Sequence, residues 1–121
     1  MKTFPLLFAF SALSLAATSV ADVAGNKICD SGICVVEFNA SFNSQNSVEW
    51  IEKLNDCETS RVDIVSAPAL QQEHKIVVVP TIVVFSEGEE VKRFQANIMM
   101  TMEASKDDVQ EAVDEIMMSD F

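Results

Sequence analysis

The order of short apolar runs along the chain is the feature that most restricts its fold. Four runs rich in β-branched residues, each bounded by turn residues, stand at 33–38, 61–65, 81–85 and 91–94. Between the first two runs, apolar residues recur at three-residue steps, which favours an amphipathic helix over 44–54. A strand, helix, strand order predicts parallel pairing through a crossover, so we expect a βαβ unit in the first half.

The second half of the chain is expected to add a short helix, a hairpin and a final helix. Pro68 predicts the start of the short helix, because proline has no N–H to lose in a first turn. The runs 81–85 and 91–94 flank a turn and are predicted to pair antiparallel. Ser105 and Asp108 resemble a capping box ahead of an amphipathic helix. The predicted fold class is α/β, βαβ followed by ββα, with a central mixed sheet flanked by helices.

The first 21 residues have the features of a cleavable secretory signal. A lysine gives a positive start, 4–17 is almost wholly apolar, and Ser19 and Ala21 are small residues placed for a cut. An uncleaved anchor is the weaker alternative, because the apolar run is shorter than the roughly 20 residues that span a bilayer. We expect a signal peptide over 1–21, one domain over 22–121, and export to the periplasm or the medium.

Charge and composition exclude several classes of partner. Asp and Glu number 19 against 8 Lys and Arg, which gives a formal net charge of −11. Such a surface repels phosphate backbones and anionic lipids, so we expect no nucleic-acid partner and no membrane partner after signal cleavage. With His74 the only histidine, the soft ligands for a zinc site are too few. No metal and no cofactor are expected.

Several motifs are similar to those of the thioredoxin family. Residues 35–40, Val-Val-Glu-Phe-Asn-Ala, resemble the family's central-strand motif Val-Val-Asp-Phe-Trp-Ala. The stretch 61–81 resembles, without a gap, the family segment that ends in Val-Pro-Thr, and 81–94 resembles its final hairpin. The resemblance covers roughly residues 33 to 118 and implies a thioredoxin-like fold.

The same comparison locates a departure at the family's active-site turn. Where the family carries Trp-Cys-Gly-Pro-Cys, this chain has 42–46, with Asn43 and Asn46 in place of both redox cysteines. An amide neither ionises near neutral pH nor forms a mixed disulfide, so thiol exchange at this turn is excluded. Glu37 takes the place of the family's buried acid, which would accept a proton from the resolving thiol, but this turn has no such thiol. We expect no catalytic residue at these degenerate positions.

The resemblance does retain a peptide-docking element. Pro80 stands where the family has a cis proline, and the backbone just ahead of it, here Val79, would pair with an extended substrate segment. A purely architectural role for this proline is the alternative. The candidate peptide-binding residues are Phe42, Val79, Pro80 and Thr81. Extended peptide or protein segments are accordingly the candidate partners, and the oligomeric state is left open.

The three cysteines allow two disulfide pairings in an exported protein. Cys34 and Cys57 are both predicted at the amino-terminal edge of the βαβ unit, which favours a structural bridge between them. Cys29 to Cys34 is the rival pairing, and the small loop that it closes would suit redox work. The leading hypothesis is a binding or structural module that lacks a redox cysteine pair. The alternative is a thiol–disulfide oxidoreductase that uses Cys29 and Cys34, so enzymatic activity is left open.

Overall fold

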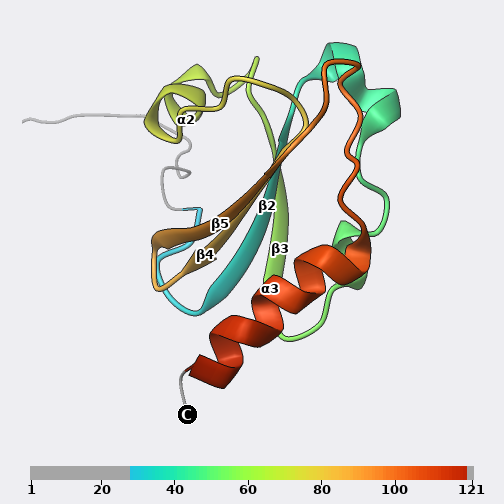
Figure 1. Cartoon of the computed structure of the whole chain (residues 1–121). Helices are drawn as coiled ribbons and strands as arrows, with labels where there is room; N and C mark the ends of the chain where they lie inside the picture. Colours follow the sequence, from blue (N-terminus) through green and yellow to red (C-terminus); the bar gives the residue numbers. More distant parts are fainter. Residues whose placement is uncertain (1–27, 120–121) are drawn as a thin grey trace, which may run out of the picture.

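The computed structural model describes residues 28–119 (Figure 1), and the predicted signal peptide lies outside them. The elements alternate between short strands, two stretches of 3₁₀-helix and two α-helices. In chain order they are β2 (Ile33–Asn39), η3 (Ser41–Asn46), η4 (Ile51–Lys53), β3 (Glu58–Asp63), α2 (Pro68–Glu73), β4 (Thr81–Ser86), β5 (Glu89–Gln95) and α3 (Lys106–Ser119). Among the residues described, no helix is both long enough and apolar enough to span a bilayer.

The four strands form one mixed sheet in the order β3-β2-β4-β5. β2 pairs parallel with β3 and antiparallel with β4, and β4 pairs antiparallel with β5. The predicted parallel pair and the predicted hairpin are therefore confirmed, as is the α/β class. The second strand begins three residues earlier than the run 61–65 indicated, because the polar residues 58–60 also pair with β2.

Side chains of β2 alternate between two apolar layers, as the pleat of a strand requires. Val35 packs with residues of α3 and η4 on one face of the sheet, the face that α3 crosses in Figure 1. Cys34, Val36 and Phe38 pack on the other face, against the segment that follows α2. The sheet is thus covered on both sides, and neighbouring residues of β2 serve different layers.

The predicted helix over 44–54 is wrong, and two 3₁₀ stretches take its place. The backbone between them bonds to side chains instead of to its own preceding turn. The Val48 N–H donates to Glu37 Oε2 at 2.8 Å, and the Val48 carbonyl accepts from Arg61 at 2.8 Å. Side chains that offer such partners compete with α-helical hydrogen bonds. The three-residue spacing of the apolar side chains matches the three residues per turn of a 3₁₀-helix.

The two α-helices begin where the sequence predicted. Pro68 is the first residue of α2, in the position that tolerates its missing N–H. Ahead of α3, the Ser105 N–H donates to Asp108 Oδ2 at 2.9 Å and the Asp108 N–H donates to Ser105 Oγ at 3.2 Å. This reciprocal pair is the predicted capping box, and it satisfies two otherwise orphaned donors.

Candidate functional site

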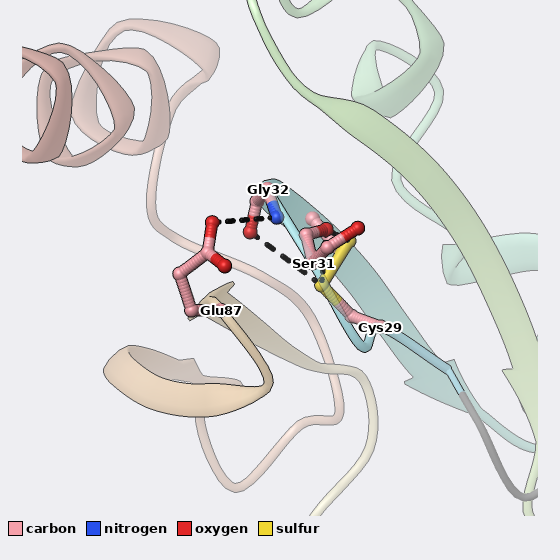
Figure 2. The surroundings of a disulfide bond; sticks show 5 residues. Cys29, Ser31, Gly32 and Glu87 are labelled. Carbon is pink, nitrogen blue, oxygen red and sulfur yellow. Dashed lines mark hydrogen bonds between the residues drawn. A yellow bond between two sulfur atoms is a disulfide. The ribbon is translucent and has the colours of Figure 1, made fainter.

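A disulfide joins Cys29 to Cys34 at the amino-terminal end of β2 (Figure 2). The two Cα atoms lie 6.0 Å apart and the cysteines are separated by five positions in the sequence. The hypothesis that the chain lacks a redox cysteine pair, and so acts as a non-catalytic module, is therefore wrong. The pair exists, but at the edge of the sheet opposite to the turn that carries Asn43 and Asn46.

The favoured bridge between Cys34 and Cys57 is also wrong. In the parallel register Cys34 lies opposite Glu58, so Cys57 falls one position out of register with it. One residue along a strand reverses the side of the sheet to which a side chain points. Cys57 packs against the apolar layer that contains Val35, whereas Cys34 belongs to the opposite layer. The sheet therefore separates the two sulfurs.

Cys57 is left as a free, half-buried thiol. Burial raises the pKa of the Cys57 thiol, and the neighbouring Asp56 carboxylate raises the pKa further. Since the thiolate is the reactive form, Cys57 is a poor nucleophile near neutral pH.

Two reciprocal hydrogen bonds hold the disulfide loop against the hairpin of β4 and β5. The Gly32 N–H donates to Glu87 Oε2 at 2.9 Å, and the Glu87 N–H donates to the Gly32 carbonyl at 2.9 Å. Figure 2 shows the Glu87 carboxylate reaching across to the loop. Gly32 has a φ of +71°, which favours glycine, so the sequence of the loop suits this conformation. Sequence reasoning missed Glu87, because no local pattern links residues 55 positions apart.

The two sulfurs differ in access to solvent. Cys34 is only 4% exposed, whereas Cys29 is half-buried. The carbonyl oxygens of Ser31 and Gly32 lie 3.6 and 3.8 Å from the Cys29 sulfur, close enough to accept an S–H in the dithiol form. Cys29 is therefore the more accessible of the two cysteines to a thiol from solution.

A hollow of about 310 Å³ opens beside Cys29. The His74 ring forms part of its lining, with centroid distances of 5.5 Å to Phe38 and 5.3 Å to Phe85. Besides Cys29 and His74, the lining residues are Ile28, Asp30, Glu73, Phe85 and Gly88. The disulfide thus borders a concave, partly apolar surface, the kind of setting in which small substrates bind.

At the carboxyl end of β2, asparagines of β2 and of η3 form an amide network. Asn43 is buried and donates through Nδ2 to Asn39 Oδ1 at 3.2 Å and to the Met100 carbonyl at 3.1 Å. Asn46 donates in turn to Asn43 Oδ1 at 2.8 Å. Buried amides that are satisfied in this way stabilise a unique local structure. Since no thiol stands among these positions, thiol exchange does not take place there.

Glu37 lies buried near this network, as its position in the resemblance implied. Its carboxylate accepts from the Val48 N–H and forms an ion pair with Arg61. Burial raises the pKa of the Glu37 carboxyl, and the Val48 hydrogen bond and the Arg61 charge only partly offset that rise. Among the residues described, the partners of this carboxylate are the Val48 N–H and Arg61, and no cysteine is among them.

Replacing Glu37 with glutamine is expected to flatten the dependence of stability on pH. A folded-state pKa above the usual 4.5 means that the folded protein binds this proton more readily than the unfolded chain. The stabilisation that comes from this tighter proton binding is present at low pH and is lost as pH rises from 4.5 through the raised pKa of Glu37. Denaturant unfolding across pH should show a shallower decline for Glu37→Gln, and no change for the exposed control Glu49→Gln. Equal slopes in all three proteins would contradict this prediction.

The four candidate peptide-binding residues are only partly brought together. Phe42, which is 65% exposed, and Val79 line one hollow of about 320 Å³, together with Ile98 and Met100. Pro80 and Thr81 are buried and do not line this hollow, and the bond between Val79 and Pro80 is cis. Within residues 28–119, neither the N–H nor the carbonyl of Val79 is hydrogen-bonded.

Within residues 28–119 there is no group of three or more His, Cys, Asp or Glu side chains that could hold a metal ion.

Reducing the disulfide is expected to lower the free energy of unfolding by about 2 kcal/mol. The chain-entropy model gives this figure for so short a loop, because the bridge restricts the unfolded chain. Urea unfolding of the Cys29→Ser/Cys34→Ser variant should show the loss, whereas the matched single variant Cys57→Ser should unfold like the wild type. A loss in the Cys57 variant that equals the loss in the double variant would contradict the pairing.

Comparison with known proteins places this geometry in a common architecture. No protein-family model and no curated protein matches the chain. Among solved structures, a mutant thioredoxin from Halobacterium salinarum NRC-1 is similar, with a TM-score of 0.58, 20% identity, and coverage of 83% of this chain and 84% of that one. Thioredoxin from Schistosoma mansoni gives a TM-score of 0.58 at 16% identity, over 76% of this chain and 83% of its own.

Thioredoxin from Fasciola hepatica is similar to the same degree, with a TM-score of 0.56, 19% identity, and coverage of 79% of this chain and 92% of that one. At such identities the likeness concerns the fold. Together with the sheet order and the motifs in the sequence, it leads to one conclusion: this chain has a thioredoxin-like fold.

Proposed function

We propose that this protein is a thiol–disulfide oxidoreductase whose working disulfide is Cys29–Cys34. The observation that carries the proposal is the position of this disulfide in a surface loop, with an accessible Cys29, a buried Cys34 and a hollow beside them. Unequal access gives the two sulfurs different roles, because exchange begins at the sulfur that a thiolate can reach. Cys29 is the attacked and attacking sulfur, and Cys34 is the resolving one.

The exchange balances with a dithiol as the co-reactant. A thiolate of the dithiol attacks the Cys29 sulfur, the bond to Cys34 breaks, and Cys34 leaves with the electron pair and takes a proton from water. The second thiol then attacks the mixed disulfide, so Cys29 is released as a thiol and the dithiol becomes a cyclic or linear disulfide. The protein gains two electrons from the dithiol and two protons through water, to which the dithiol releases its own two thiol protons. The reverse sequence oxidises a dithiol substrate.

The test is equilibration of the oxidised protein with dithiothreitol buffers that contain known ratios of dithiol and disulfide. We expect Cys29 and Cys34 to titrate together as one two-electron couple, with Cys57 outside it, and the reduced protein to pass its electrons to insulin disulfides. A Cys57→Ser variant should behave as the wild type. Failure of the native disulfide to exchange under conditions that reduce small-molecule disulfides would contradict the proposal.

The proposed setting is an exported one. A disulfide persists in oxidising compartments, and residues 1–21 have the features of a cleavable signal. We place the working protein at 22–121, outside the cytosol, where disulfide exchange has substrates.

Extended peptide segments are the proposed protein partners, at the hollow that contains Phe42 and Val79. The unbonded backbone of Val79 supports this, because an extended chain can add to it as a short strand. This hollow and the disulfide lie at opposite ends of β2, a strand of seven residues, so they are separated by roughly 20 Å. Docking there and exchange at Cys29 would be separate events.

A further inference from the structure

The hollow beside Cys29 combines an apolar wall with unpaired acidic groups. Ile28 and Phe85 supply apolar surface, and Asp30 and Glu73 supply two carboxylates. Both carboxylates belong to exposed residues, and neither has an ion-pair partner within residues 28–119. Any group that approaches the Cys29 sulfur through this hollow therefore passes two negative charges.

Two basic residues adjoin His74 in the described part of the chain, and one of them is engaged. Arg93 forms an ion pair with Glu90 at 2.8 Å, and its remaining guanidinium N–H groups donate to the carbonyls of His74 and Lys75. Lys75 is exposed, with no ion pair among the described residues. On the opposite side, the Glu87 carboxylate is bound to the loop that carries the disulfide. Among the described residues, the carboxylates of Asp30, Glu73 and Glu87 therefore outnumber the one unpaired cation that adjoins His74, Lys75.

We propose that this hollow selects the thiol substrate, and that the preferred substrate carries a positive charge next to its sulfur. The inference rests on the proposed redox function and deepens it. A thiolate must approach as an anion, so an acidic surface slows the approach of every thiolate except one whose own cation offsets the charge. The apolar wall would contact the carbon chain between the cation and the sulfur.

Three small thiols form a series that isolates the charge of the nucleophile. The thiolates of cysteamine, 2-mercaptoethanol and 3-mercaptopropionate have net charges of about 0, −1 and −2 at neutral to alkaline pH. Each attacks the Cys29 sulfur, forms a mixed disulfide there and expels Cys34 as a thiolate. A second molecule of the same thiol then releases Cys29 and leaves as the small disulfide. As in the dithiol reaction, the protein gains two electrons and two protons, and here two thiol molecules leave as one small disulfide.

The experiment measures the second-order rate constant of reduction for each thiol, expressed per thiolate. Each value is divided by the rate of the same thiol with bis(2-hydroxyethyl) disulfide, a neutral reference that removes differences in intrinsic nucleophilicity. At low salt we expect cysteamine to exceed 3-mercaptopropionate by about tenfold in this corrected ratio. Raising the ionic strength should reduce the preference, because screening weakens exposed charges.

Matched variants assign the preference to the hollow. The Asp30→Asn/Glu73→Gln variant should lower the preference to about twofold, since the two local charges are gone. The Glu49→Gln/Glu52→Gln variant changes the net charge by the same amount, and both residues are exposed. Their neighbours Val48 and Ile51 pack on one face of the sheet, whereas Cys34 packs on the other. This control should keep the tenfold preference.

The outcomes separate the two proposals. Equal corrected rates for all three thiols, or a preference that survives in Asp30→Asn/Glu73→Gln, would overturn the substrate class and leave the redox function standing. A preference that both double variants lose equally would assign it to net charge and would also overturn the role of the hollow. Absence of any exchange at Cys29–Cys34 would overturn the redox function itself.

Discussion

Replacing Cys34 with serine is expected to convert the protein into a trap that holds a small thiol on Cys29. Without Cys34, a mixed disulfide on Cys29 has no resolving sulfur within the loop, so it accumulates. Incubation with a small disulfide followed by intact-mass measurement and peptide mapping should find the adduct on Cys29. Insulin reduction by this variant should fall to the background rate, because the two-electron cycle is broken.

The reciprocal variant separates the roles of the two sulfurs. In Cys29→Ser, the remaining Cys34 is buried at 4% exposure, so the native protein should form little adduct at that position and no insulin reduction should remain. Cys57→Ser is the matched control and should keep the full cycle. Adduct formation on Cys34 as fast as that on Cys29, or insulin reduction retained by Cys29→Ser, would contradict the assignment.

Truncating Phe38 to alanine is expected to cause the largest loss of stability among single substitutions considered. Phe38 is fully buried in β2 and packs in the layer that contains Cys34 and Val36. Its ring also lies 5.5 Å from the His74 ring, centroid to centroid. Removing a buried aromatic ring loses its transfer free energy and leaves a cavity, at a cost of about 3–5 kcal/mol. Urea unfolding measures this loss when the variant and the wild type show the same dependence of the free energy of unfolding on urea concentration.

Phe42→Ala provides the same chemical change four residues away at an exposed position. Phe42 is 65% exposed, so its truncation should alter the free energy of unfolding by no more than about 0.5 kcal/mol. Similar losses for Phe38→Ala and Phe42→Ala would contradict the assignment of Phe38 to the core. Because Phe38 supports His74, its truncation is also expected to disturb the hollow beside Cys29.

The strands were predictable because their periodicity and composition are local properties. The runs 33–38 and 81–85 form the two central strands, where burial on both faces requires continuous apolar residues. The capping residues of α3 were equally predictable from the sequence, since Ser105 and Asp108 are only three positions apart and bond to each other. The family motifs indicated a thioredoxin-like fold with a mixed sheet, whereas the order β3-β2-β4-β5 comes from the structure, because local patterns alone do not fix it.

The failures have a common physical cause, which is contact between residues far apart in the sequence. The segment 44–54 has a helical spacing, but Glu37 and Arg61 bind its backbone at Val48 and prevent an α-helix. The disulfide depends on the face of the sheet to which Cys34 points, and a shift of one residue in register decides this. Glu87, which holds the disulfide loop, is invisible to any local pattern.

The most direct test of the account is differential alkylation of the protein before and after brief exposure of its native form to dithiothreitol. Thiols are labelled under denaturing conditions with one reagent before reduction and a second reagent after it, and the cysteines are assigned by peptide mapping. We expect Cys57 to take the first label, and Cys29 and Cys34 to become available together under mild reduction. A bridge that includes Cys57, or a Cys29–Cys34 bond that the dithiol does not open in the native protein, would contradict it.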